Sequence, residues 1–191
     1  MHITPEIVKE LEAKYGVPRV IRLTEEFDQW GYQLLRESLR KSRHHDVTLF
    51  IVKDGRVVVT RKHRYPPNTY RIPSGGVRLG EAFEAGAKRE AYEETGLRIE
   101  LVRYILRVLA CLTYQGKEVD WVSHVFLARC LGGELLPIDL REIEGVRLAE
   151  VEELRTTLHQ ALLSSGIRGL RYRAALTKAA LEEIREKDLT L

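Results

Sequence analysis

The chain has 191 residues, of which 44% are hydrophobic and 31% are charged, and its formal net charge at pH 7 is +3. This size supports one well-buried core, and the composition is that of a globular rather than a disordered chain. No run of residues approaches the roughly 18 apolar positions that a membrane span requires, and the mild positive charge suits a small anionic ligand better than a nucleic acid.

Cysteine usage and the N-terminal sequence indicate a cytoplasmic protein without a membrane partner. Cys111 and Cys130 lie far apart and form no metal-type pair, so we expect two free thiols. Residues 1–16 carry charges throughout and lack the apolar segment of a signal peptide. A single asparagine, Asn68, together with abundant Glu, Arg and Leu, indicates a thermophilic source.

The first 44 residues have a helical spacing of apolar side chains. Thr4 is a suitable N-cap with Pro5 at the first helical position, and a second helical pattern runs from Phe27 to Leu39. We therefore predict an N-terminal helical extension over residues 1–44.

The spacing of apolar residues changes to period two near residue 47. Two β-branched runs flank Asp54 and Gly55, which is the sequence signature of a β-hairpin with a tight turn. Strands are predicted over residues 47–52, 57–60, 97–114, 117–130 and 146–151.

Helical segments alternate with these strands. They are predicted over residues 81–95, from about residue 152, and from about residue 169 to residue 187. Strands that bracket helices in a chain of this size indicate an α/β protein with a mixed sheet packed between helices. We place the main domain at residues 45–165 and a C-terminal helix at residues 166–191, packed on the domain or on a dimer partner. A homodimer is a hypothesis.

Three carboxylates carry the strongest chemical signal. Glu90, Glu93 and Glu94 have i, i+3 and i+4 spacing, so a helix places all three on one face. Like charges at this spacing cost an isolated helix roughly 0.2–0.5 kcal/mol per pair, and a hard divalent cation with oxygen ligands would offset that cost. The alternative is an exposed helix whose acids are merely solvated.

The whole window from residue 75 to residue 97 resembles the Nudix box, Gly-x5-Glu-x7-Arg-Glu-U-x-Glu-Glu-x-Gly-U, where U is apolar. The matching residues are Gly75, Glu81, Arg89, Glu90, Ala91, Glu93, Glu94, Gly96 and Leu97. Ala91 and Leu97 fill the two apolar places, and the other seven residues are fixed by the pattern. Seven fixed matches arise by chance on the order of once in 10^8 starting positions. The resemblance implies a Nudix fold, an α/β/α sandwich on a mixed sheet, over roughly residues 45–165. It also implies hydrolysis of a diphosphate linkage in a nucleoside diphosphate joined to another group.

The resemblance also implies roles for the box residues. Glu90 and Glu94 look like the principal ligands of Mg2+ or Mn2+, with Glu93 as a further ligand or water-activating group. Gly75 would offer a main-chain carbonyl to the metal. Arg89 and Glu81 look like the pair that braces the cluster, and Glu81 could also act through a metal-bound water.

The family often adds one acid from a loop well downstream of the box, as a ligand or general base. The candidates are Glu134, Asp139, Glu142 and Glu144. Aligning the strand and helix that follow the loop makes Glu142 the first choice and Glu144 the second.

A basic and aromatic stretch directly before the box supplies the candidate substrate-binding residues Arg61, Arg64, Tyr65 and Arg71. Such groups hold phosphates and stack on bases, and Arg64 or Arg71 is favoured for this role. The alternative is an ordinary solvated strand edge.

The substrate stays open between ADP-ribose, a dinucleoside polyphosphate and another nucleotide. Tyr114 lies about where dinucleoside-polyphosphate hydrolases of the family carry a tyrosine, whereas the Pro-Ser-Gly-Gly entry to the box looks like the ADP-ribose group. A catalytically silent Nudix-fold sensor or interaction module is the alternative from a different class. The retention of every box carboxylate disfavours it.

Overall fold

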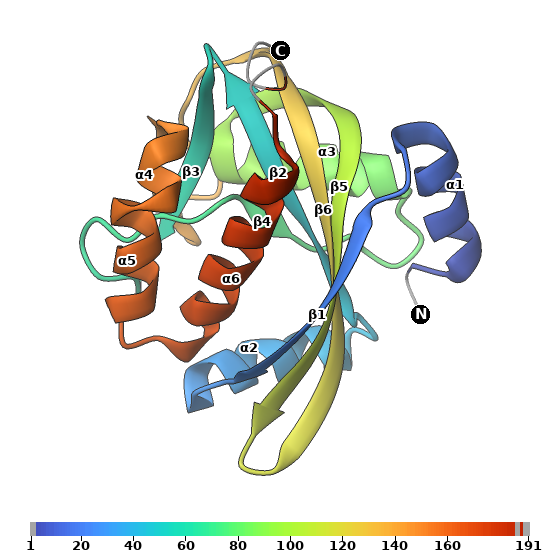
Figure 1. Ribbon diagram of the computed structural model, residues 1–191, viewed down its shortest axis with the longest axis vertical. Coiled ribbons are helices and arrows are strands. Elements are labelled where there is room, and N and C mark those ends of the chain that lie inside the picture. Colours follow the sequence, from blue (N-terminus) through green and yellow to red (C-terminus); the bar gives the residue numbers. More distant parts are fainter. Residues whose placement is uncertain (1–2, 186–187, 189–191) are drawn as a thin grey trace.

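The computed structural model describes residues 3–185 and residue 188, and it shows a mixed sheet between two layers of helices (Figure 1). The helices are α1 (Pro5–Tyr15), α2 (Gln29–Arg40), α3 (Phe83–Thr95), α4 (Val151–Arg155), α5 (Thr157–Ser164) and α6 (Arg168–Glu183). The strands are β1 (Arg19–Glu26), β2 (His45–Lys53), β3 (Arg56–Lys62), β4 (Ser74–Gly75), β5 (Leu97–Tyr114), β6 (Lys117–Gly133) and β7 (Ile143–Ala149). The predicted α/β class is confirmed.

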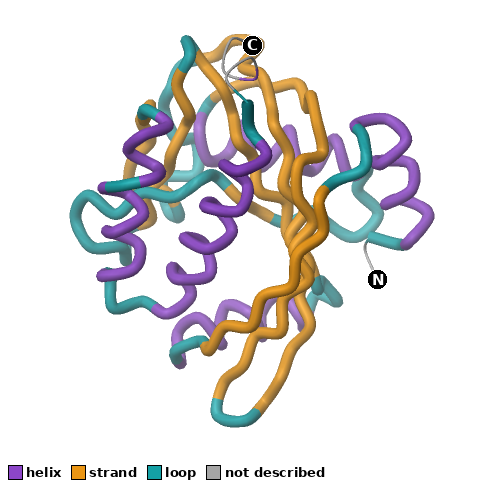
Figure 2. Tube along the Cα trace, in the orientation of Figure 1, coloured by secondary structure: helices purple, strands orange, loops and turns teal. Residues whose placement is uncertain are grey.

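The sheet has seven strands in the order β1-β5-β6-β2-β3-β7, and the short β4 pairs with β2. The β1–β5 and β6–β2 pairs are parallel, while the other pairs are antiparallel. The predicted tight turn at Asp54 and Gly55 is present, and Gln115 and Gly116 form a second turn; all four residues have positive φ. The tube in Figure 2 shows the long β5–β6 hairpin running the length of the molecule.

Each face of the sheet carries its own hydrophobic core because side chains alternate along the strands. Along β2, Val47, Leu49 and Ile51 belong to the core covered by α1 and α3. Phe50 and Val52 belong to the core on the opposite face, which contains residues of α2, α4, α5 and α6. The helices of the C-terminal third and the helix that carries the box therefore lie on opposite sides of the sheet (Figure 1).

The helical prediction for residues 1–44 is wrong over Arg19–Glu26, which form β1. This segment pairs in parallel with β5, so that Ile21 lies beside Val108 and Leu23 beside Ala110. The apolar residues Ile21 and Leu23 alternate with Arg22 and Thr24, which is the period of a strand. The N-terminal segment therefore contributes an edge strand to the main sheet as well as two helices.

The C-terminal helix α6 packs within the chain. Its buried residues are Leu170, Tyr172, Ala174, Leu176, Thr177, Ala180 and Leu181. The predicted stretch 166–191 extends into residues 186–187 and 189–191, which lie outside the described part of the chain. Among the helices that the structure describes, none is long and apolar enough to cross a membrane. A homodimer stays a prediction.

Candidate active site

The box residues meet where β4 and the start of α3 cross β2. Ser74 and Gly75 pair with Thr48 and Val47 of β2, which fixes the glycine loop against the sheet. A Cβ atom on Gly75 would lie 1.9 Å from Oε2 of Glu90, so only glycine allows the carboxylate this close to the backbone. The backbone N–H of Gly76 donates to Oε1 of Glu90 at 3.1 Å. The glycine loop and the first predicted metal ligand are therefore in direct contact.

Arg89 is the centre of the carboxylate cluster. Its Nε and Nη2 donate to the two oxygens of Glu81 at 2.8 and 2.9 Å. Its Nη1 donates to Glu90 at 2.8 Å and to Glu93 at 2.9 Å, and Nη2 also reaches the carbonyl of Gly76 at 2.9 Å. Glu81 lies two residues before the first residue of α3, so the helix begins later than predicted and the bidentate pair connects the loop to the helix.

Glu94 lies deeper than the rest of the cluster and is 3% exposed. Its Oε1 accepts from Nη2 of Arg71 at 3.1 Å, and its Oε2 accepts from the backbone N–H of Ser74 at 3.1 Å. The hydroxyl of Thr60 lies 3.4 Å from the same Oε2. Two segments, the strand β3 and residues 71–74, thus hold one carboxylate against the sheet.

The environment of the cluster separates the acidities of its members. The hydrogen bond from Arg89 lowers the pKa of Glu81 to about 2, against a smaller opposing effect of burial. Burial raises the pKa of Glu90, and the nearby charge of Glu94 adds to the rise, although Arg89 opposes both. A half-buried carboxylate whose pKa is raised by burial and by a neighbouring negative charge is a site where a cation is stabilising.

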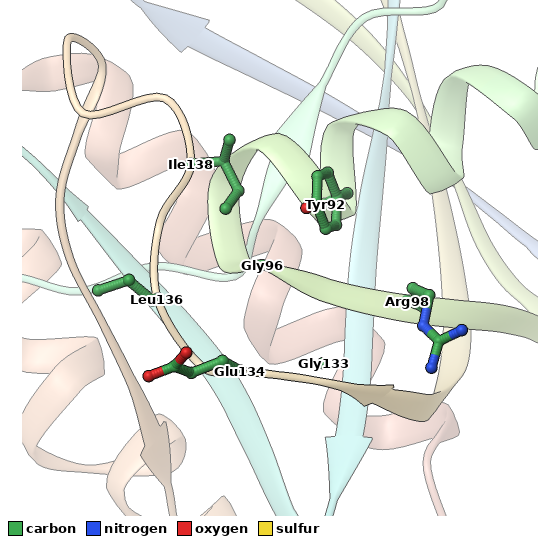
Figure 3. A pocket seen from close by; sticks show the side chains of 7 residues that line it. All are labelled: Tyr92, Gly96, Arg98, Gly133, Glu134, Leu136 and Ile138. Atoms are coloured by element: carbon green, nitrogen blue, oxygen red, sulfur yellow. The ribbon is translucent and has the colours of Figure 1, made fainter.

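The loop between β6 and β7 is fastened to the end of α3. The backbone N–H groups of Ile138 and Asp139 donate to the carbonyl of Glu93 at 3.0 and 2.9 Å. Figure 3 shows Ile138 beside the last turn of this helix, with Leu136 and Glu134 following the same loop. The middle of the loop, including Asp139, is therefore held against the last turn of α3.

The two leading candidates in this loop lie on different sides of the sheet. Along β3, Lys62 points to the same face as Thr60 and pairs with Glu142, whereas Arg61 points to the other face and pairs with Glu144 at 2.7 Å. Since Thr60 contacts Glu94, the face that carries Glu142 is the face of the box. Burial raises the pKa of Glu142, but Lys62 and the more distant Arg71 outweigh it and hold this pKa below its usual value.

The predicted substrate-binding residues fall into two groups. Arg71 is 3% exposed and Tyr65 is 8% exposed, and the hydroxyl of Tyr65 accepts from Nε of Arg71 at 3.2 Å. Tyr65 and Arg71 therefore contact each other and Glu94, and they do not point into an open substrate site. Arg61 lies over the ring of Tyr70, and the exposed Arg64 lies over the ring of Trp30. These two arginines are not brought together with the box carboxylates.

Sequence reasoning missed three residues that shape the cluster: Thr60, Lys62 and Ser74. Thr60 and Ser74 contact Glu94, and Lys62 pairs with Glu142. The period-two alternation of β3 carried a usable signal, because Val58, Thr60 and Lys62 share the face that packs against α3.

The oxygen donors gathered here fit a hard divalent cation in chemical type. The side chains of Glu90, Glu93 and Glu94 and the carbonyl of Gly75 are the candidate ligands. Within residues 3–185 and 188, however, no three acidic, histidine or cysteine side chains already stand at metal-ligand spacing. Arg71 contacts the carboxylate of Glu94, and Arg89 contacts those of Glu90 and Glu93.

Comparison with known proteins agrees with this fold. A model of the NUDIX domain matches residues 42–166. The chain therefore belongs to the NUDIX domain family.

Two curated relatives carry more specific names. The chain is 44% identical over 126 residues to an RNA pyrophosphohydrolase of Caulobacter vibrioides, a match that covers 53% of this chain and 69% of the relative. It is 36% identical over 92 residues to the mutator protein MutT4 of Mycobacterium tuberculosis, covering 48% of this chain and 37% of that protein. The chain thus spans well under two thirds of MutT4.

Solved structures show the same fold. A MutT NUDIX hydrolase from Burkholderia pseudomallei aligns with a TM-score of 0.50 at 24% identity, over 74% of this chain and 98% of that one. A NUDIX hydrolase from Nitrosomonas europaea aligns with a TM-score of 0.51 at 22% identity, over 73% and 70%.

Proposed function

We propose that this protein hydrolyses a phosphoanhydride bond in a nucleoside diphosphate joined to another group, using water and Mg2+ or Mn2+. The observation that supports this most is the contact of Gly75 with Glu90, because it presents a carboxylate and a main-chain carbonyl together at one point. Glu94 lies deeper on the same helix, and Glu142 lies on the same face of the sheet.

Each side chain has a distinct part in this proposal. Glu90 and Glu94, with Glu93 and the carbonyl of Gly75, hold the metal. When bound, a divalent cation would neutralise the diphosphate and lower the pKa of the attacking water. Arg89 fixes the direction of the carboxylates of Glu90 and Glu93, since it contacts both through Nη1.

Glu142 is the proposed general base. Its pKa is held below the usual value by Lys62, so the carboxylate is ionised at neutral pH and can accept a proton from water. Lys62 restrains the side chain until substrate arrives. Glu144 faces the other side of the sheet and is not proposed for this role.

The other predicted site residues receive narrower roles. We propose that Arg71 and Tyr65 position Glu94, while Arg61 and Arg64 remain candidates for contact with a distal part of the substrate. The silent sensor remains the alternative from another class, and the protein is proposed to act in the cytoplasm.

A second candidate substrate is the 5′ end of RNA. The identity of 44% over 126 residues to an RNA pyrophosphohydrolase favours it. The net charge of +3 is small for a protein that holds a polyanion, so a small nucleotide stays the first choice.

One screen tests both candidates. ADP-ribose, dinucleoside polyphosphates, nucleoside triphosphates, sugar nucleotides and 5′-triphosphorylated RNA are incubated with the protein in Mg2+ and then in Mn2+, and products are separated by chromatography. We expect one small-molecule class to be cleaved at a phosphoanhydride bond. Preference for RNA by more than tenfold in kcat/KM would favour the second candidate. Silence across the panel with retained nucleotide binding would favour the sensor.

A further inference from the structure

A large cavity lies between α1 and the β5–β6 hairpin, beside the box but outside it. Its volume is about 840 Å3, within the range of pockets that hold small molecules. The floor is a two-stranded ladder in which Arg107 pairs with His124 and Leu109 pairs with Val122. The first turns of α1 form the opposite wall, and Figure 1 shows this helix standing beside the two long strands.

The wall formed by α1 is held in place by contacts in the last turn of the helix. Glu12 accepts from Nη1 of Arg107 at 3.1 Å, which connects the helix to the cavity floor. Lys14 pairs with Glu84 of the box helix at 2.6 Å, and the ring of Tyr15 meets that of Phe126 edge-on. The cavity is therefore a built feature whose wall is connected to α3.

The lining of the cavity comes within two residues of the β2 position that pairs with the glycine loop. His45 lines it, and two residues further on Val47 pairs with Gly75, a step of about 7 Å along a strand. The neighbouring Arg43 packs so closely on Gly76 that a Cβ atom there would lie 1.4 Å from its Nη1. At the other side, the ring of Phe83 at the start of α3 contacts His124 of the floor.

The lining combines flat apolar surfaces with a few polar groups. Pro5 and Val8 of α1 and Leu109 and Val122 of the hairpin supply apolar lining, which suits the face of a planar ring. Nε of Arg107 is buried and has no hydrogen-bond partner in the described part of the chain. Because an unpartnered buried donor is costly, an acceptor atom of a ligand would be stabilised there.

A carboxylate at the rim adds a hydrogen-bond acceptor to the donor offered by Arg107. Asp120 is exposed at the edge of the cavity and can accept hydrogen bonds from ring or exocyclic N–H groups. A purine presents acceptors on one edge and donors on another, as well as a flat apolar face. Ribose and phosphate alone offer no such face.

We propose that this cavity is the nucleoside-binding subsite, and that it holds a purine base of the substrate between α1 and the β5–β6 hairpin. The inference rests on the proposed function, since the phosphates of the same molecule would extend past His45 to the glycine loop. The wall from α1 lies outside residues 42–166, so this subsite is a feature of this chain's own N-terminal segment.

The test measures binding without turnover. AMP, GMP and ribose 5-phosphate are titrated calorimetrically into the protein with a chelator present. We expect both purine nucleotides to bind at least tenfold more tightly than ribose 5-phosphate. Equal affinity for all three ligands would overturn the proposal.

Two variants locate the binding site. Val8→Trp fills the cavity and is expected to weaken purine nucleotide binding at least tenfold, whereas Val17→Trp, at a position that is 80% exposed on the adjoining turn, is the matched control. Asp120→Ala, at the exposed rim, is expected to weaken binding several-fold and does not depend on repacking α1. Wild-type affinity in both Val8→Trp and Asp120→Ala would contradict the assignment.

The outcome separates this proposal from the hydrolase proposal. Purine binding that Val8→Trp abolishes supports the subsite even if no substrate in the panel is cleaved, in which case the proposed activity fails. Conversely, hydrolysis whose KM is the same in Val8→Trp and Val17→Trp supports the activity and refutes the subsite.

Discussion

Arg71 and Glu94 form an ion pair of 3.1 Å in which only 3% and 4% of the two side chains are exposed. Each is further satisfied, Arg71 by the carbonyl of Ile72 and the hydroxyl of Ser74, and Glu94 by a backbone N–H. Burying such a pair costs desolvation energy, so it contributes less to net stability than to the position of the carboxylate.

Removing one partner should therefore lower the free energy of unfolding by more than the intact pair contributes to it. Arg71→Met leaves the carboxylate of Glu94 buried without its cation, and we expect a loss of about 3–5 kcal/mol in the free energy of unfolding. Urea denaturation measures it. Arg64→Met, which removes an exposed arginine lying over Trp30, is the control and should cost under about 1 kcal/mol. Equal losses in the two variants would contradict the structural role of the pair.

The assignment of the general base can be tested with two neighbouring acids. Glu142→Gln should lower kcat by about 10^2–10^4-fold with little change in KM, because it removes a proton acceptor on the box side of the sheet. Glu144→Gln makes the same chemical change on the opposite side of the sheet, and its kcat should stay within a few-fold of the wild-type value. A larger loss of kcat in Glu144→Gln would reverse the assignment.

Glycine at position 75 is required by the carboxylate beside it. Gly75→Ala places a methyl group 1.9 Å from Oε2 of Glu90, so the carboxylate must move and kcat should fall by about 10^2-fold. Gly145→Ala is the control, because a Cβ atom there meets its nearest neighbour, the hydroxyl of Tyr70, at an ordinary 3.4 Å. Unchanged kcat in Gly75→Ala, measured on the best substrate, would mean that Glu90 does not act from this position.

Stability at acid pH should depend on His124. Burial lowers the pKa of His124 to about 3, with the neighbouring His45 contributing in the same direction, while an unfolded histidine titrates near 6.5. Between these values the unfolded chain binds more protons, so the free energy of unfolding falls as pH drops below 6.5. From pH 7.5 to 4.5 this one group should account for a loss of about 2–3 kcal/mol.

The matched variants for this prediction are His124→Gln and His63→Gln. Denaturation at several pH values should show a shallower acid slope only for His124→Gln, since His63 is exposed. The same slope in wild type and His124→Gln would show that other groups cause the acid sensitivity.

The sequence was most informative where function depends on local spacing. The box residues, the turn at Asp54 and Gly55, and the helix stop at Gly96 follow from the conformations of consecutive residues, and the structure contains all three. The strand Arg19–Glu26 was missed because its many charged residues obscure the alternation of apolar and polar side chains. The strand with which it pairs, β5, lies about 90 residues away in the sequence.

Long-range partners explain the remaining gap in the site. The sequence suggested that Arg71 is a free cation available to a substrate. In the structure it is buried and pairs with Glu94, which lies 23 positions downstream. Similarly, the sequence ranked Glu142 above Glu144 by alignment alone, and their different partners, Lys62 and Arg61, are visible only in the structure.

The most direct test of the central claim is the rate of phosphoanhydride hydrolysis as a function of Mg2+ concentration in wild type and Glu90→Gln. Gln keeps the size of the side chain and an acceptor for the N–H of Gly76, so the fold should persist by circular dichroism. The account predicts saturable dependence on Mg2+, no turnover in excess chelator, and a loss of at least 10^2-fold in Glu90→Gln. Turnover that survives the chelator, or a wild-type rate in Glu90→Gln, would contradict it.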